Sequence, residues 1–146
     1  MVLIRALVVV ALLTGTLVAC SSGEDAQTIS ETQKFHFLES LKQVDAAGRQ
    51  LQQSEPSREA LSAALAMLDE AIKMSYQVDR RELEKLDLRL GKNYLRFFVS
   101  GLEEYRLGIE AGDQQQQQQG LSLLNSWNQF WQAEKETILA RAHPSQ

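Results

Sequence analysis

The chain has 146 residues, of which 15 are Lys or Arg and 19 are Asp or Glu, and its formal net charge is −4 at pH 7. This length is typical of a single domain. An acidic chain without a cluster of basic residues is a poor candidate for binding nucleic acid, because phosphate recognition depends on concentrated positive charge. The low content of glycine and proline, 8 and 2 residues, favours a helical protein.

The N-terminal segment has the organisation of a secretory signal peptide. Arg5 supplies a short positive region, and a mostly apolar run follows over residues 6–18. This run is too short to cross a bilayer as a helix, which takes about 20 apolar residues. Its length and its position after a single positive charge are typical of the hydrophobic region of a signal peptide.

The apolar run ends in Leu17, Val18, Ala19 and Cys20, and this motif resembles the lipobox of bacterial lipoproteins. The resemblance implies cleavage before Cys20, a diacylglycerol on its sulfur and, in many such proteins, an N-acyl chain on its new amino group. Two or three acyl chains anchor a protein stably where one chain would not. Cys20 is the only cysteine, so no internal disulfide can form. The alternative is an ordinary signal peptide whose cleavage region happens to contain a cysteine.

The same resemblance divides the chain and suggests its location. Residues 1–19 would be removed, residues 20–29 would form a lipid-anchored tether, and residues 30–146 would form a helical domain. The mature chain from residue 20 would then have 14 basic and 19 acidic side chains, a formal charge of −5. An Asp directly after the cysteine commonly marks retention in the inner membrane, whereas here Ser21 follows. We therefore expect a lipoprotein on the periplasmic face of the outer membrane of a Gram-negative bacterium.

Apolar residues at helical spacing predict a helix over residues 30–53 and another over residues 57–77. Phe37, Leu41 and Val44 begin the stripe of the first, at steps of four and three. Ser30 stands three residues before Gln33, which is the spacing of a capping box. The second stretch carries one stripe of leucine and isoleucine beside another of alanine and methionine, a pattern expected where a neighbouring helix packs closely.

The stretch over residues 80–111 is the most apolar and predicts one long, uninterrupted helix. Its apolar stripe contains Gly101 and Gly108, and glycine is unfavourable inside a helix. We therefore expect these glycines to admit a crossing helix at short distance. Gly112 is the expected C-terminal cap.

The final stretch, residues 114–142, predicts a helix whose Trp127 and Trp131 are buried. It opens with six glutamines over residues 114–119, for which a helical first turn and disorder are both open interpretations. Four amphipathic stretches joined by short turns predict an all-α fold, arranged as an up-down-up-down four-helix bundle.

Ligand spacings typical of metal and haem proteins are missing from the sequence. Di-iron bundles use Glu-x-x-His pairs, but Gln33 precedes His36 by three residues and Ala140 precedes His143. A haem held by His36 and a methionine is a remote alternative to an ordinary surface histidine. Phosphate-binding and nucleophile motifs are also missing. We therefore expect no metal, no cofactor beyond the acyl chains, and no enzymatic activity.

The function predicted from these patterns is a non-enzymatic binding or assembly module for another protein of the cell envelope. The motivation is the excess of apolar residues in the stretch over residues 80–111. The residues expected to face a partner or to line a ligand site are Phe97, Phe98, Val99, Tyr105, Leu107 and Trp131. The alternative is a carrier that holds a small hydrophobic ligand between its helices, lined by the aromatic members of this set.

Overall fold

The computed structural model describes residues 29–52 and 57–142. Within these two ranges every regular element is a helix and no strand occurs, which confirms the all-α prediction. The signal peptide, the lipobox with Cys20 and the tether up to residue 28 lie outside the described residues. None of the described helices is both long enough and apolar enough to cross a membrane.

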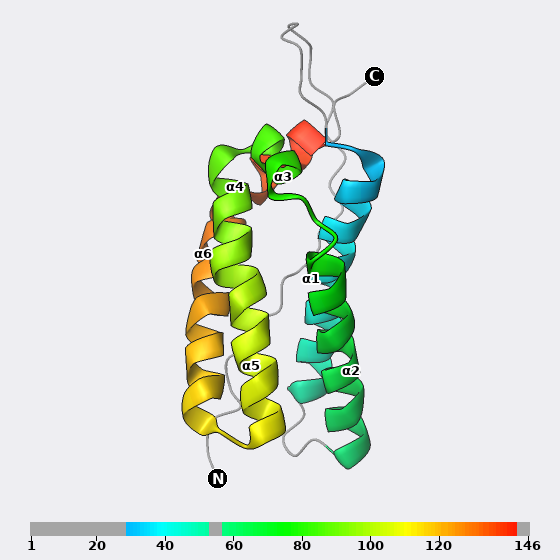
Figure 1. The fold of residues 1–146 in the computed structure, drawn as a ribbon, viewed down its shortest axis with the longest axis vertical. Coiled ribbons are helices and arrows are strands. Elements are labelled where there is room, and N and C mark those ends of the chain that lie inside the picture. Colours follow the sequence, from blue (N-terminus) through cyan, green and yellow to red (C-terminus); the bar gives the residue numbers. More distant parts are fainter. Residues whose placement is uncertain (1–28, 53–56, 143–146) are drawn as a thin grey trace, which may run out of the picture.

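The first two helices pack against each other along their length (Figure 1). Helix α1 (Glu31–Leu51) begins at Ser30, whose side chain accepts a hydrogen bond from the backbone N–H of Gln33 at 3.3 Å. Helix α2 (Arg58–Ser75) begins in the same way at Ser57, which accepts from the backbone N–H of Ala60 at 3.1 Å. A serine at this position satisfies an amide that the helix leaves free.

The expected continuous helix over residues 80–111 is divided, so this prediction was wrong. The chain forms α3 (Arg80–Leu86), α4 (Leu88–Asn93), the π-helix η1 (Tyr94–Val99) and α5 (Ser100–Ala111). The break lies at Asp87, whose backbone is extended and whose carboxylate accepts from the N–H of Arg89 at 2.8 Å. Arg141 donates to the carbonyl of Leu86 at 2.7 Å. Both ends of the break therefore have hydrogen-bond partners.

The π-helix η1 follows α4 directly, with no turn between the two helices. In this segment the backbone is wound more widely than in an α-helix, which changes the face that each side chain presents. Ser100, the first residue of α5, donates its hydroxyl to the carbonyl of Leu95 at 3.1 Å. Tyr94 and Phe98 stack on one side of η1, with ring centroids 5.0 Å apart.

Helix α6 (Gln114–Ala142) includes the whole glutamine run, which confirms the helical interpretation of residues 114–119. The preceding turn has the predicted cap, because Gly112 adopts a left-handed backbone with φ of 66°. The carboxylate of Asp113 then accepts from the backbone N–H groups of Gln115 and Gln116. The glutamine run therefore forms the first turns of α6, and Asp113 caps the N-terminus of this helix.

Helices α5 and α6 lie side by side in Figure 1 and approach each other through glycines. A Cβ atom added to Gly108 would lie 2.5 Å from the backbone nitrogen of Gln117. One added to Gly120 would lie 2.7 Å from both Cα and Cβ of Tyr105. The predicted close crossing at the glycines of the apolar stripe is thus confirmed, and Gly120 supplies the matching site on α6.

Aromatic side chains from α1, η1 and α6 pack against one another in the core. Trp127 is 3% exposed and Trp131 is 1% exposed, as their stripe predicted. Phe37 of α1 contacts both Tyr94 and Trp131 edge to face, with centroids 5.3 and 5.6 Å apart. These contacts join α1, η1 and α6 into a single core.

Candidate functional site

The residues predicted to face a partner or line a ligand site are split between core and surface. Phe98, Tyr105 and Trp131 are buried, and Phe97 is half-buried. Val99 is only 5% exposed, which corrects its assignment as a partner-facing residue. The reason is that Val99 belongs to η1, where the altered winding places it among the buried residues.

The buried rings of the predicted set pack on other rings of the chain. Phe98 lies 5.3 Å from Trp127, and Trp127 stacks on Trp131 at 5.7 Å between centroids. Tyr105 faces Gly120 across the α5–α6 contact instead of joining this cluster. A surface hollow of about 400 Å³ lies elsewhere, along α1 around Phe35. The predicted lining residues do not border it.

The structure contains a cluster of three buried hydroxyl groups that the sequence analysis did not predict. Tyr94 of η1 lies with its hydroxyl 2.8 Å from Ser40 Oγ of α1, and it donates to Ser75 Oγ of α2 at 3.1 Å. All three side chains are at most 1% exposed. A signal was present, because Ser75 continues the buried positions Leu68 and Ala71 at steps of three and four.

The hydroxyl cluster is suited to holding helices together and not to acid–base chemistry. Burial raises the pKa of Tyr94 to about 12, against the smaller lowering effect of its hydrogen bonds to the two serines. The phenol is therefore neutral near pH 7, and it is closed off from solvent. Burial likewise raises the pKa of Tyr105.

The acidic residues that lie near the apolar stripes are paired with arginines. Glu134 of α6 accepts from Arg89 at 2.8 Å. Asp87 lies 3.5 Å from Arg89 and 3.7 Å from Arg141. In the described part of the chain, no three His, Cys, Asp or Glu side chains group as ligands for a metal ion.

One exposed surface combines apolar and basic side chains. We call it the basic–apolar strip and define it as Leu88, Lys92, Leu95 and Arg96 on α4 and η1. Leu88 is 79% exposed and Leu95 is 39% exposed, and both cations are exposed beside them. The guanidinium of Arg96 lies 5.2 Å from the ring centre of Phe97, a cation–π contact.

Among the described residues, the cations of this strip have no acidic partner. Among residues 29–52 and 57–142, neither Lys92 nor Arg96 forms an ion pair. By contrast, Arg89 and Arg106 each contact two carboxylates. Leu107, which was predicted to face a partner or to line a ligand site, lies on α5 outside the strip and is 44% exposed.

Comparisons with protein-family models, with curated proteins and with solved structures find no match to this chain.

Proposed function

We propose that the chain is a lipid-anchored protein of the bacterial cell envelope whose helical domain is a non-enzymatic module that binds another envelope protein. The anchor is inferred from the motif over residues 17–20 and the apolar run before it. A diacylglycerol would be attached to the sulfur of Cys20, cleavage before Cys20 would free its amino group, and acylation of that amino group would follow as in many such proteins. The expected location is the periplasmic face of the outer membrane.

We further propose that the helices act as an up-down-up-down four-helix bundle, in which α3, α4, η1 and α5 together form the third arm. The arrangement in Figure 1 supports this, since α1 lies beside α2 and α5 lies beside α6. The break at Asp87 changes the direction of the arm near one end only.

The observation that carries the binding role is the basic–apolar strip. Exposed leucines offer contact area, and cations without partners attract acidic groups and disfavour basic ones. Leu88, Lys92 and Leu95 recur at steps of four and three, the spacing that an amphipathic helix meets in a groove or on a neighbouring helix. The partner surface that fits is an acidic amphipathic helix.

The carrier of a small hydrophobic ligand is the less supported alternative. Its predicted lining residues Phe98 and Trp131 are at most 1% exposed, and each contacts the ring of Trp127. A ligand between them would have to separate rings that already contact one another.

The test is photo-crosslinking in living cells with the crosslinking amino acid placed at Leu88 or at Leu95. We expect one protein adduct of defined size from both positions. The adduct should be lost when Lys92→Glu and Arg96→Glu are introduced together, because they reverse the charge of the strip.

The matched control is the pair Arg58→Glu and Arg81→Glu, which makes the same change in charge at exposed positions outside the strip. Both residues lie in the first turn of a helix, where an acidic residue is favourable, so the fold should be retained. Loss of the adduct in this control, a crosslink to lipid in place of protein, or a stoichiometric small molecule extracted from the purified chain would each contradict the proposal.

A further inference from the structure

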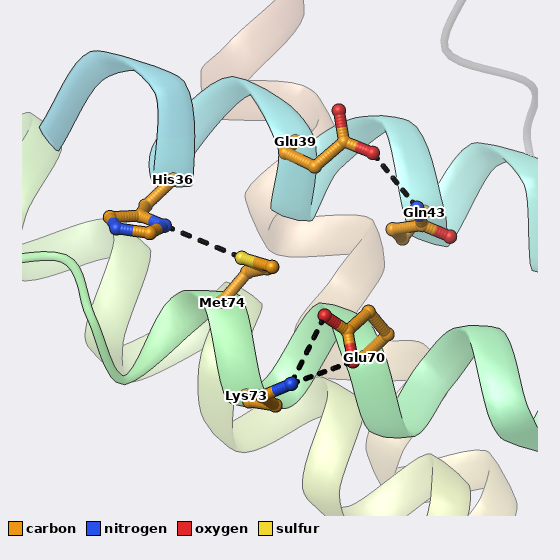
Figure 2. A network of polar contacts seen from close by, with 6 residues as sticks. All are labelled: His36, Glu39, Gln43, Glu70, Lys73 and Met74. Atoms are coloured by element: carbon orange, nitrogen blue, oxygen red, sulfur yellow. Dashed lines mark hydrogen bonds and ion pairs between the residues drawn. The ribbon is translucent and has the colours of Figure 1, made fainter. Parts of the chain in front are cut away.

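A histidine and a methionine far apart in the sequence meet between α1 and α2. The Nδ1 atom of His36 lies 3.3 Å from the sulfur of Met74, and the two side chains point toward each other across the helix pair (Figure 2). Both residues are half-buried, so that solvent and small ions reach them. The ring of Phe35 packs edge to face against the imidazole at 5.6 Å between centroids.

The carboxylates closest along the two helices have other partners. On α1, Glu39 accepts from Gln43 at 2.8 Å and from Lys42, and these contacts hold the pKa of Glu39 below its usual value. On α2, Glu70 pairs with Lys73 at 3.3 Å. Figure 2 shows the carboxylate of Glu39 directed toward Gln43 and that of Glu70 directed toward Lys73. The two donor atoms facing each other are therefore one nitrogen and one thioether sulfur.

We propose that His36 and Met74 form a binding site for a soft monovalent cation of the Cu(I) or Ag(I) type. Thioether sulfur is a soft ligand that selects Cu(I), and imidazole nitrogen also binds copper, whereas hard cations need oxygen ligands. When Nδ1 binds the cation, the neutral imidazole carries its proton on Nε2. This site is independent of the partner-binding role proposed above.

The observed separation suits a bent site with an open position. If the bond lengths of zinc, about 2.1 Å to nitrogen and 2.3 Å to sulfur, are used as a guide, a cation bridging two atoms 3.3 Å apart would have an N–cation–S angle of about 100°. An increase of about 0.5 Å in the distance between Nδ1 of His36 and the sulfur of Met74 would give an N–cation–S angle of about 120°, which is trigonal, with the same bond lengths. Half-buried side chains can make this adjustment by small rotations, and water can fill the third position.

The first experiment uses the full-length chain in detergent with the substitution C20S, which removes the only thiol and with it a competing soft ligand. Silver nitrate is titrated while the methionine methyl and histidine ring resonances are followed by NMR. We expect the signals of Met74 and His36 to shift together and to saturate at about one equivalent. The methyl signal of Met67, on the same helix, should stay in place.

The second experiment compares affinities of variants in the same C20S background. Met74→Leu keeps the side-chain volume, and it should weaken silver binding at least about tenfold because the soft ligand is lost. His36→Gln should do the same. The controls Met67→Leu and His143→Gln should bind as the parent does.

Zinc provides the test of ligand softness, because structural zinc sites use four ligands of cysteine, histidine or carboxylate type and not thioether sulfur. Zinc sulfate at the same concentration should leave both signals unchanged. The proposal is overturned if Met74 does not respond to silver, if Met74→Leu binds silver as tightly as Met67→Leu, or if zinc produces the same response.

Discussion

The hydroxyl cluster of Ser40, Tyr94 and Ser75 provides a quantitative test of how α1, α2 and η1 are held together. Each serine can donate its own proton to a carbonyl of its helix, Ser40 to Phe37 and Ser75 to Ala71, both at 2.7 Å. Within the described chain the phenol of Tyr94 has just the two serine oxygens as partners. It has one proton and needs one acceptor.

Removing one serine should therefore cost little, and removing both should cost more than the sum. Ser40→Ala or Ser75→Ala leaves the other serine as acceptor, so each should lower the free energy of unfolding by about 0.5–1.5 kcal/mol. The double variant leaves the phenol proton buried without an acceptor, which adds a penalty of about 1–3 kcal/mol. Tyr94→Phe introduced into the double variant should recover that penalty, because no donor is then left without a partner.

The measurement is urea unfolding of the four chains of the double-mutant cycle and of the triple variant, followed by the fluorescence of Trp127 and Trp131. Agreement of the double variant with the sum of the singles to within about 0.5 kcal/mol would refute the reasoning, because sites that act independently add in this way. Failure of Tyr94→Phe to restore stability would also refute it.

The same structure makes four other predictions. The folded chain keeps the Tyr94 proton up to about pH 12, so Tyr94 should lower stability by up to about 3 kcal/mol between pH 10 and 12. Tyr94→Phe should remove this contribution in alkaline unfolding curves and leave that of Tyr105, whose pKa is also raised. Gly120→Ala should lower the melting temperature by crowding the backbone of Tyr105; a rise, as an unobstructed helix would give, would count against the close approach. Trp127→Ala should cost about 3–5 kcal/mol in urea unfolding, and an unchanged midpoint would contradict its burial. Cys20→Ala should abolish metabolic labelling with a fatty-acid analogue, and equal labelling of the variant would contradict the anchor.

The start of α1 and the end of α5 were predictable because their determinants are local. Ser30 caps α1 through an amide three residues away, and Gly112 ends α5 through its own backbone angle. The burial of Trp127 and Trp131 also follows from the spacing of apolar residues within one helix. Each of these features can be determined from a window of a few turns.

Features that depend on residues distant in the sequence were not predictable in the same way. The break at Asp87 is stabilised by Arg141, which donates to the carbonyl of Leu86 from the far end of α6. Val99 was predicted to face a partner or to line a ligand site, but it is a buried residue of the π-helix η1. The contact of His36 with Met74 depends on the register of α1 against α2, which no spacing within either helix specifies.

The two proposed sites can be tested separately because they share no residue and no element. The basic–apolar strip lies on α4 and η1, whereas the His36–Met74 pair lies between α1 and α2. Sites without shared partners usually respond additively to substitution. Met74→Leu should therefore leave crosslinking from Leu95 unchanged, and the charge reversal of Lys92 and Arg96 should leave silver binding unchanged. If one set of substitutions altered both readouts, the shared cause would be the packing of the whole bundle, and neither surface could be credited with binding on its own.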